Sequence, residues 1–146
     1  MSDAFDVSVL PFAALMGLEI THAAPDRVEG RLVVRPDLCT AGAILHGGAA
    51  MALADSLGAV GAFLSTPAGM RTTTLESKTN FIGSAKAGST VTATATPLHI
   101  GRRQLGADRQ AAAEQQYDEN SDSEFHAGRQ VIYQDGRARR MRNTRA

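Results

Sequence analysis

Two residues with chemically active side chains, His46 and Asp55, lie in an almost uncharged part of the sequence. His46 is followed by Gly47 and Gly48, and Asp55 comes nine residues after His46 in a run with no other charged residue. A carboxylate buried in an apolar helix is costly unless it is paired, is solvated in a pocket or is retained for chemistry. Asp55 is therefore the first candidate for a reactive group.

The two glycines are expected to open a helix with backbone N–H groups that can polarise a carbonyl. The first N–H groups of a helix lack intrahelical acceptors and lie at the positive end of the helix dipole. A carbonyl oxygen placed against the N–H of Gly47 would be activated, and such a donor typically stabilises an oxyanion by about 3 kcal/mol. Asp55 lies two turns later on the same helix face as Gly48, where it could act as a nucleophile or as a general base.

A purely structural interpretation of the same residues stays open. A histidine before a helix is often a cap, and a helical aspartate can pair with a buried Arg or Thr. Cys39 has no second thiol beside it and is expected to be inert. The histidines and carboxylates show no metal-ligand spacing, so we predict no metal site.

Composition favours one domain that binds a small molecule or a protein. A chain of 146 residues supports one sizeable core, and its 15 basic and 15 acidic residues cancel, which argues against nucleic acid or an anionic membrane as partner. A single cysteine favours the cytoplasm, and the acidic N-terminal sequence does not resemble a secretory signal. The apolar run 49–64 is shorter than the roughly 20 residues of a membrane span, so we expect a buried helix and no membrane association.

Hydrophobic periodicity predicts strands on both sides of this helix. The helix is expected from Gly47 to about Ser65, and small residues all round its circumference suggest that a curved sheet wraps it closely. Residues 18–23 and 27–35 alternate and flank a Pro-Asp turn, which indicates an antiparallel hairpin. The other expected elements are a short helix over 9–16 and strands over 72–82 and 89–96.

Beyond Arg103 the sequence changes character. Only seven of its last 43 residues are large and apolar, an acidic block covers 117–124 and a basic block covers 137–145. Within this segment we expect one strand over 130–134 and a short helix over 108–116.

Three motifs occur in order: His46-Gly47-Gly48 with the downstream Asp55, the Thr-rich segment 74–82, and the Gly-Arg-Arg at 101–103. Through them residues 15–103 resemble the hotdog-fold acyl-CoA thioesterases of the phenylacetyl-CoA thioesterase-like family. The resemblance implies an α+β fold in which a long central helix is wrapped by a curved antiparallel sheet. It also implies hydrolysis of acyl-CoA thioesters with an aromatic or medium-chain acyl group, without a metal or redox cofactor, since coenzyme A is part of the substrate.

The resemblance assigns roles to individual residues. Asp55 would be the nucleophile or general base, Gly47 would polarise the carbonyl, His46 would position the loop or substrate, and Thr74 would orient the attacking water. Family members assemble these groups across the interface of a homodimer, often within a homotetramer. The further residues expected to contact substrate are Gly48, Thr40, Lys86, Arg102 and Arg103, the last three as candidates for the CoA phosphates.

Departures from the family pattern leave alternatives open. Thr40 stands where relatives often carry Asn or Gln, and Gly83-Ser84 replaces a common Arg-Pro pair. A non-catalytic acyl-CoA-binding domain is one alternative, and a hotdog dehydratase or hydratase is another, although the Gly-Gly pair after His46 and the lack of a His-Phe-Pro type loop argue against the latter.

The resemblance also requires two more strands after Arg103. We therefore divide the chain into a thioesterase core over 1–103 and an atypical C-terminal segment over 104–146, whose contribution to the sheet is in question. A reading-frame change in the gene near Gln104 is the favoured hypothesis for this change. Genuine divergence, and a segment that folds only against a partner, are the alternatives.

Overall fold

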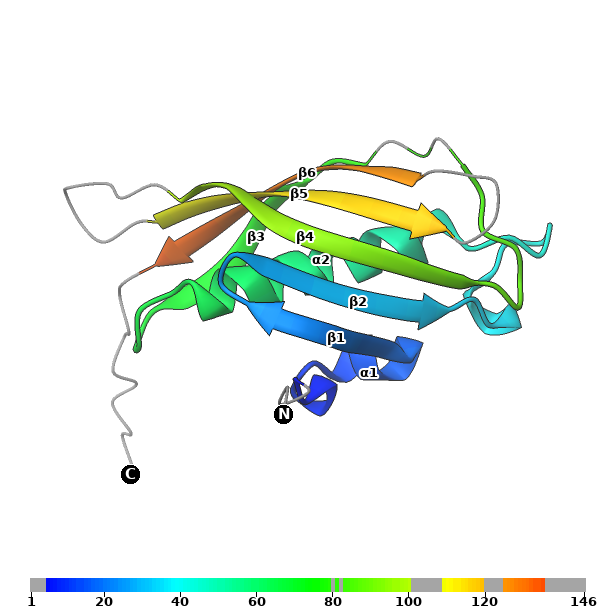
Figure 1. The fold of residues 1–146 in the computed structure, drawn as a ribbon, viewed down its shortest axis with the longest axis horizontal. Helices are drawn as coiled ribbons and strands as arrows, with labels where there is room; N and C mark the ends of the chain where they lie inside the picture. Colours follow the sequence, from blue (N-terminus) through cyan, green and yellow to red (C-terminus); the bar gives the residue numbers. More distant parts are fainter. Residues whose placement is uncertain (1–4, 80, 82, 101–108, 120–124, 136–146) are drawn as a thin grey trace, which may run out of the picture.

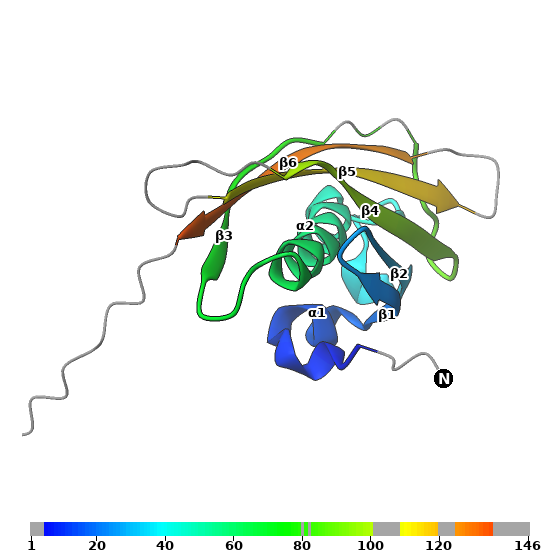
Figure 2. The ribbon, with the colours of Figure 1, turned by 60° about the vertical axis from the view of Figure 1, so that its left-hand side comes forward.

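One long helix, α2 (Gly47–Leu64), lies across the concave face of a six-stranded antiparallel sheet (Figures 1 and 2). The strand order is β1-β2-β4-β5-β6-β3, so β1 and β3 form the two edges. The structure is a computed structural model that describes residues 5–79, 81, 83–100, 109–119 and 125–135. The predicted α+β hotdog architecture, a central helix within a curved antiparallel sheet, is confirmed.

As far as Ile100 the elements follow the predicted order, except that the strand expected over 72–82 ends at Ser77. The strands are β1 (Leu18–Ala24), β2 (Arg27–Val33), β3 (Arg71–Ser77), β4 (Thr90–Ile100), β5 (Arg109–Glu119) and β6 (Phe125–Asp135). The short helical elements are η1 (Val7–Val9), α1 (Pro11–Met16) and η2 (Pro36–Leu38). Pro11 begins α1 and Gly17 ends it at a φ of 78°, a backbone conformation that glycine adopts without strain.

The core forms between one face of α2 and the alternate residues of the sheet. Leu53 and Leu57 of α2 are fully buried, as are Val28 and Leu32 on β2 and Val91 on β4. The predicted hairpin is present, with β1 and β2 antiparallel and Leu18 opposite Leu32. This packing fixes the rotation of α2 about its axis and therefore determines which helix residues face away from the sheet.

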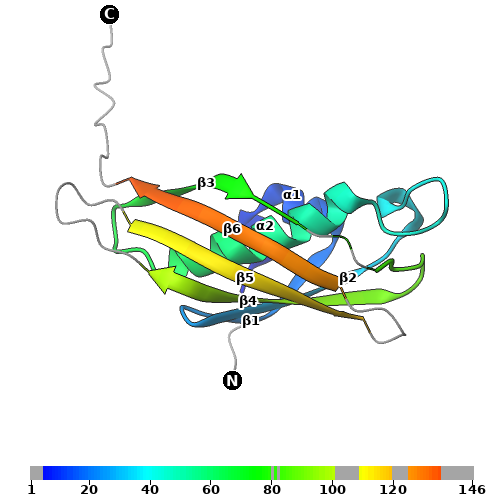
Figure 3. The ribbon, with the colours of Figure 1, turned by 90° about the horizontal axis from the view of Figure 1, so that it is seen from above.

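The C-terminal segment contributes two strands to the sheet, β5 between β4 and β6, and β6 between β5 and the edge strand β3 (Figure 3). The expected strand over 130–134 is confirmed as part of β6. The expected helix over 108–116 is wrong, because its described residues from Arg109 onward belong to β5. Ala, Glu and Gln favour helix locally, but strand pairing on both sides overrides that weak preference.

The sheet wraps α2 from one side and is not closed, and α1 packs on part of the other side (Figure 2). Met51, Ala52, Asp55, Ser56 and Ala59 are only half-buried on the other face. By length and composition α2 is apolar enough to cross a membrane, with a mean hydropathy of 1.4 and 39% of the segment buried, but a core helix has the same properties. A core helix whose apolar residues are only half-buried on one side is suited to packing against another surface.

Candidate active site

His46 caps the N-terminus of α2 with its side chain. Its Nδ1 accepts a hydrogen bond from the N–H of Gly48 at 2.9 Å, and its backbone is extended as expected of an N-cap residue. The cap is anchored because the N–H of His46 donates to the carbonyl of Leu38 at 2.8 Å. An Nδ1 that accepts a hydrogen bond carries no proton, so the neutral ring carries its proton on Nε2. His46 therefore positions the first turn of the helix.

Gly47 carries the N–H that is left available at this helix end. The cap occupies the N–H of Gly48, whereas the N–H of Gly47 has no acceptor within the described part of the chain. A Cβ at Gly47 would lie 3.2 Å from Cζ of Phe81, so the aromatic ring packs closely against this turn. The site thus offers one free N–H at the positive end of the helix dipole, beside an apolar wall.

Asp55 and Thr74 meet across the gap between α2 and β3. The Oγ1 of Thr74 donates a hydrogen bond to Oδ1 of Asp55 at 2.8 Å, and both residues are half-buried. Because the threonine hydrogen is directed to the carboxylate, the lone pairs of Oγ1 can accept a hydrogen bond from water. The arrangement is suited to holding a water molecule beside a carboxylate base.

Gly47 and Asp55 of one chain are too far apart to act on the same carbonyl group. They are eight residues apart in a continuous α-helix, which corresponds to an axial separation of about 12 Å. A carbonyl oxygen hydrogen-bonded to Gly47 lies within about 3 Å of that N–H. The two predicted functional groups are therefore present, but a single chain does not bring them together.

None of the other predicted substrate contacts, Thr40, Lys86, Arg102 and Arg103, is shown to lie beside Gly47 or Asp55. Thr40 is exposed, and its Oγ1 accepts from the N–H of Gly42 at 3.3 Å, so the side chain stabilises its own loop. Lys86 is exposed on a segment bridged to Ile44, three residues before Gly47. Arg102 and Arg103 lie outside the described residues.

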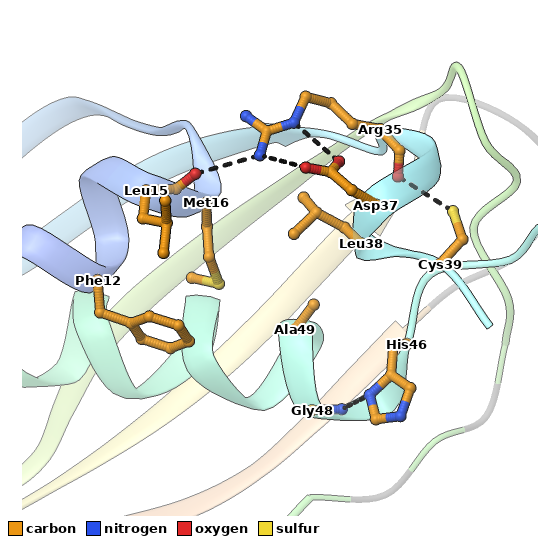
Figure 4. Close-up of a pocket in the computed structure, with 10 residues that line it drawn as sticks. All are labelled: Phe12, Leu15, Met16, Arg35, Asp37, Leu38, Cys39, His46, Gly48 and Ala49. Carbon is orange, nitrogen blue, oxygen red and sulfur yellow. Dashed lines mark hydrogen bonds and ion pairs between the residues drawn. The ribbon is translucent and has the colours of Figure 1, made fainter.

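A cavity of about 420 Å³ lies between α1 and the start of α2 (Figure 4). Its polar edge is formed by Arg35, whose Nη2 donates to the carbonyl of Leu15 and whose guanidinium pairs with Asp37 at 3.1 Å. The hydrogen bond from Arg35 lowers the pKa of the Asp37 carboxyl group. Sequence reasoning missed this cavity, because its wall joins segments that are about 20 residues apart, and only the apolar spacing of Phe12, Leu15 and Met16 hints at it.

Within the described ranges, no group of three or more His, Cys, Asp or Glu side chains is arranged to hold a metal ion. Cys39 is a free thiol that donates to the carbonyl of Arg35 at 3.2 Å.

Replacing His46 tests its capping role. We expect His46→Ala to lower the free energy of unfolding by about 1 kcal/mol, because the Gly48 N–H loses its acceptor. His46→Asn should retain most of the stability, because a short amide oxygen also caps helices well. Urea denaturation at one fixed protein concentration measures both variants, and equal losses in the two would contradict a capping role.

The chain is similar to several known proteins. The family model of the thioesterase superfamily matches residues 42–115, just over half of the chain. A Mycobacterium tuberculosis protein with a provisional esterase name is 36% identical over 98 residues, which cover 65% of this chain and 69% of the relative. The 1,4-dihydroxy-2-naphthoyl-CoA hydrolase of Escherichia coli is 32% identical over 88 residues, covering 60% of this chain and 64% of that enzyme.

Solved structures agree with the fold. The structure of the M. tuberculosis relative superimposes with a TM-score of 0.73 at 28% identity, covering 88% of this chain and 98% of that one. A thioesterase from Haemophilus influenzae superimposes with a TM-score of 0.78 at 20% identity, covering 97% of this chain and 98% of that one. At this identity the likeness shows the fold alone.

Proposed function

Because this chain belongs to the thioesterase superfamily, we propose that it hydrolyses acyl-CoA thioesters to a free acid and coenzyme A. Membership and the names of the relatives support a hydrolase in general. The observation that carries the proposal of thioester hydrolysis is the hydrogen bond from Thr74 to Asp55. It holds a carboxylate beside a hydroxyl that can bind water, on the half-buried side of α2. The proposal includes no metal and no redox cofactor, and it places the reaction in the cytoplasm.

The proposed reaction begins with the thioester carbonyl hydrogen-bonded to the N–H of Gly47. As a general base, Asp55 takes a proton from a water held by Thr74, and the resulting hydroxide attacks the carbonyl carbon. The oxyanion is stabilised by the Gly47 N–H, and its collapse breaks the C–S bond and releases the CoA thiolate, which takes up the proton held by Asp55 and so restores the carboxylate. If Asp55 is instead the nucleophile, the same collapse leaves an acyl anhydride that water hydrolyses.

The distance between Gly47 and Asp55 supports a site built from two copies of the chain. In a two-fold symmetric dimer with antiparallel α2 helices, Gly47 of each copy can approach Asp55 of the other, which gives two equivalent sites. The surface required is available, because Met51, Ala52 and Asp55 of α2 are only half-buried on the side away from the sheet and β3 is an edge strand. Phe63 on α2 and Leu75 on β3 are 64% and 57% exposed, and a dimer would bury such side chains. A tetramer would combine two such dimers.

The proposed contacts to the CoA moiety are three basic residues, of which Lys86 lies near the start of α2. Lys86 is positioned by the bridge to Ile44, and its exposed ammonium group can reach a phosphate. Arg102 and Arg103 complete the proposed phosphate contacts on grounds of sequence alone.

A thiol-release assay over a panel of acyl-CoAs tests the proposed reaction. Production of free coenzyme A together with the free acid is the expected result. Binding of acyl-CoA without release of thiol would instead indicate a non-catalytic binding domain, and hydration of enoyl-CoA without release of thiol would indicate a hydratase.

Complementation between inactive variants tests the two-copy site. Asp55→Asn and Gly47→Pro should each be nearly inactive alone, since each lacks one essential group. After subunit exchange in an equimolar mixture, each mixed dimer has one intact site, so about a quarter of the wild-type activity should return. Each variant put through exchange alone is the control, and a mixture that stays inactive while mixed dimers are demonstrated would place the whole site within one chain.

A further inference from the structure

An exposed aromatic ring, that of Phe81, packs against the first turn of α2. A Cβ built on Gly47 would lie 3.2, 3.3 and 3.7 Å from the Cζ, Cε1 and Cε2 atoms of this ring. These atoms form the free end of the ring, so this end, rather than the base of the side chain, covers Gly47. Phe81 is nevertheless 51% exposed. The ring therefore contacts the helix on one side and stays open to a ligand on another.

The free end of the ring lies near the N–H that is proposed to bind the thioester carbonyl. Standard backbone geometry places Cζ of Phe81 within about 6 Å of the nitrogen of Gly47. A carbonyl oxygen that accepts a hydrogen bond from this N–H lies about 3 Å from the nitrogen. The carbonyl carbon and the sulfur follow that oxygen by one and two bonds. A thioester bound at Gly47 is therefore within van der Waals reach of the ring.

The connection between β3 and β4 favours the sulfur, rather than the acyl chain, as the neighbour of the ring. This connection carries both Phe81 and Lys86, the proposed phosphate contact. It is held beside the chain that leads into α2, because the N–H of Leu45 donates to the carbonyl of Ala85 at 2.7 Å and Ile44 is bridged to Lys86. A CoA moiety that extends towards Lys86 leaves the thioester through its sulfur, on the side of Phe81.

We infer that Phe81 contacts the thioester sulfur and makes the site selective for thioesters over oxygen esters. The inference rests on the proposed thioester hydrolysis. Sulfur is polarisable and packs favourably about 5 Å from an aromatic ring, often at its edge, whereas an ester oxygen lacks this contact. The edge of the ring also carries partial positive charge. It stabilises the negative charge that the sulfur gains as the C–S bond breaks, beside the positive end of the helix dipole.

Phe81→Leu tests the contact, because leucine is a large apolar side chain without a ring. Phe12→Leu is the matched control, since Phe12 is also an exposed phenylalanine, 61% exposed, but lies on α1. For each protein, kcat/KM is measured from the release of hexanoic acid with hexanoyl-CoA and with its analogue that has an ester oxygen in place of the sulfur. A second pair, 4-nitrophenyl hexanoate and the corresponding thioester, makes the same exchange on a more reactive leaving group.

Phe81→Leu should lower the ratio of thioester to oxygen-ester kcat/KM about 2- to 10-fold in both pairs, with little change for the oxygen esters. Phe12→Leu should leave the ratio unchanged. Asp55→Asn should lower both kinds of ester together, because it acts on the attacking water. A displaced Gly47 would also affect both kinds alike, so the ratio reports contact with the sulfur. Phe81→Ala should shift the ratio in the same direction even if Phe81→Leu fails to fold.

The outcomes separate the role of the ring from the reaction itself. If the wild type releases thiol from neither hexanoyl-CoA nor phenylacetyl-CoA, the proposed function fails. If it releases thiol but the ratio is unchanged in Phe81→Leu and Phe81→Ala, the inference is overturned and the proposed function stands. Equal losses with thioesters and oxygen esters overturn it as well, because Phe81 would then only support the turn at Gly47. The same holds for an equal shift of the ratio in Phe12→Leu.

Discussion

Replacing Asp55 by Asn lowers kcat for acyl-CoA hydrolysis by about 10²- to 10⁴-fold, the usual contribution of a positioned general base. The variant keeps the shape of the side chain, and its amide oxygen can still accept the hydrogen bond from Thr74 that is 2.8 Å long in the native protein. Thermal unfolding should therefore change little while turnover is lost. Thiol release under saturating acyl-CoA measures the effect.

A neighbouring substitution provides the control for Asp55→Asn. Ser56 is the next residue on α2, is equally half-buried, and its Oγ donates to the carbonyl of Ala52 at 2.7 Å within the helix. Ser56→Ala should retain activity, because this hydroxyl is satisfied locally. Full turnover in Asp55→Asn, or a similar loss in Ser56→Ala, would remove Asp55 from the proposed mechanism.

The central helix and its N-terminal turn could be predicted from sequence because their signals are local. The Gly47–Gly48 pair indicates the helix start, and the apolar run that follows has no other assignment compatible with its length. The meeting of Thr74 with Asp55 is different, because periodicity alone does not place a strand residue against a particular helix residue. The family resemblance gave Thr74 and Asp55 roles around the same water but no contact with each other, and the structure shows that the two side chains are hydrogen-bonded.

Features that depend on distant parts of the chain could not be predicted. The strand β5 has the composition of a helix, and only its pairing with β4 and β6 makes it extended. The packing of Phe81 against Gly47 joins segments 34 residues apart, and no spacing rule relates them. The side of α2 that stays half-buried could not be predicted for the same reason, since a uniformly apolar helix does not reveal which side the sheet covers.

The one-helix geometry also limits what a single chain can do. The helix start supplies a donor and the helix centre supplies a carboxylate, about 12 Å apart along the axis. Their separation is a property of the α-helix itself, so side-chain rearrangement does not remove it. A second copy in antiparallel orientation can bring its own Gly47 to Asp55 of the first copy. Catalysis would then require the dimer, so activity should fall on dilution below the dissociation constant of the dimer.

Gly47→Pro separates the donor role of Gly47 from its structural role. Proline lacks an N–H but is favourable at the first position of a helix, where Gly47 lies. The residue before a proline must be extended, and His46 already has φ −66° and ψ 134°. We therefore expect the helix to form normally while kcat falls about 10²- to 10³-fold, the usual cost of losing an oxyanion donor.

The matched control for this variant is Gly47→Ala. Its Cβ meets the Phe81 ring at 3.2 Å, as the proline Cβ does, but it retains the N–H. A small loss in Gly47→Ala beside a large loss in Gly47→Pro, with both proteins equally stable and equally dimeric, assigns the effect to the hydrogen-bond donor. Equal losses in the two would assign it to crowding against Phe81, and the carbonyl would then need another donor than Gly47.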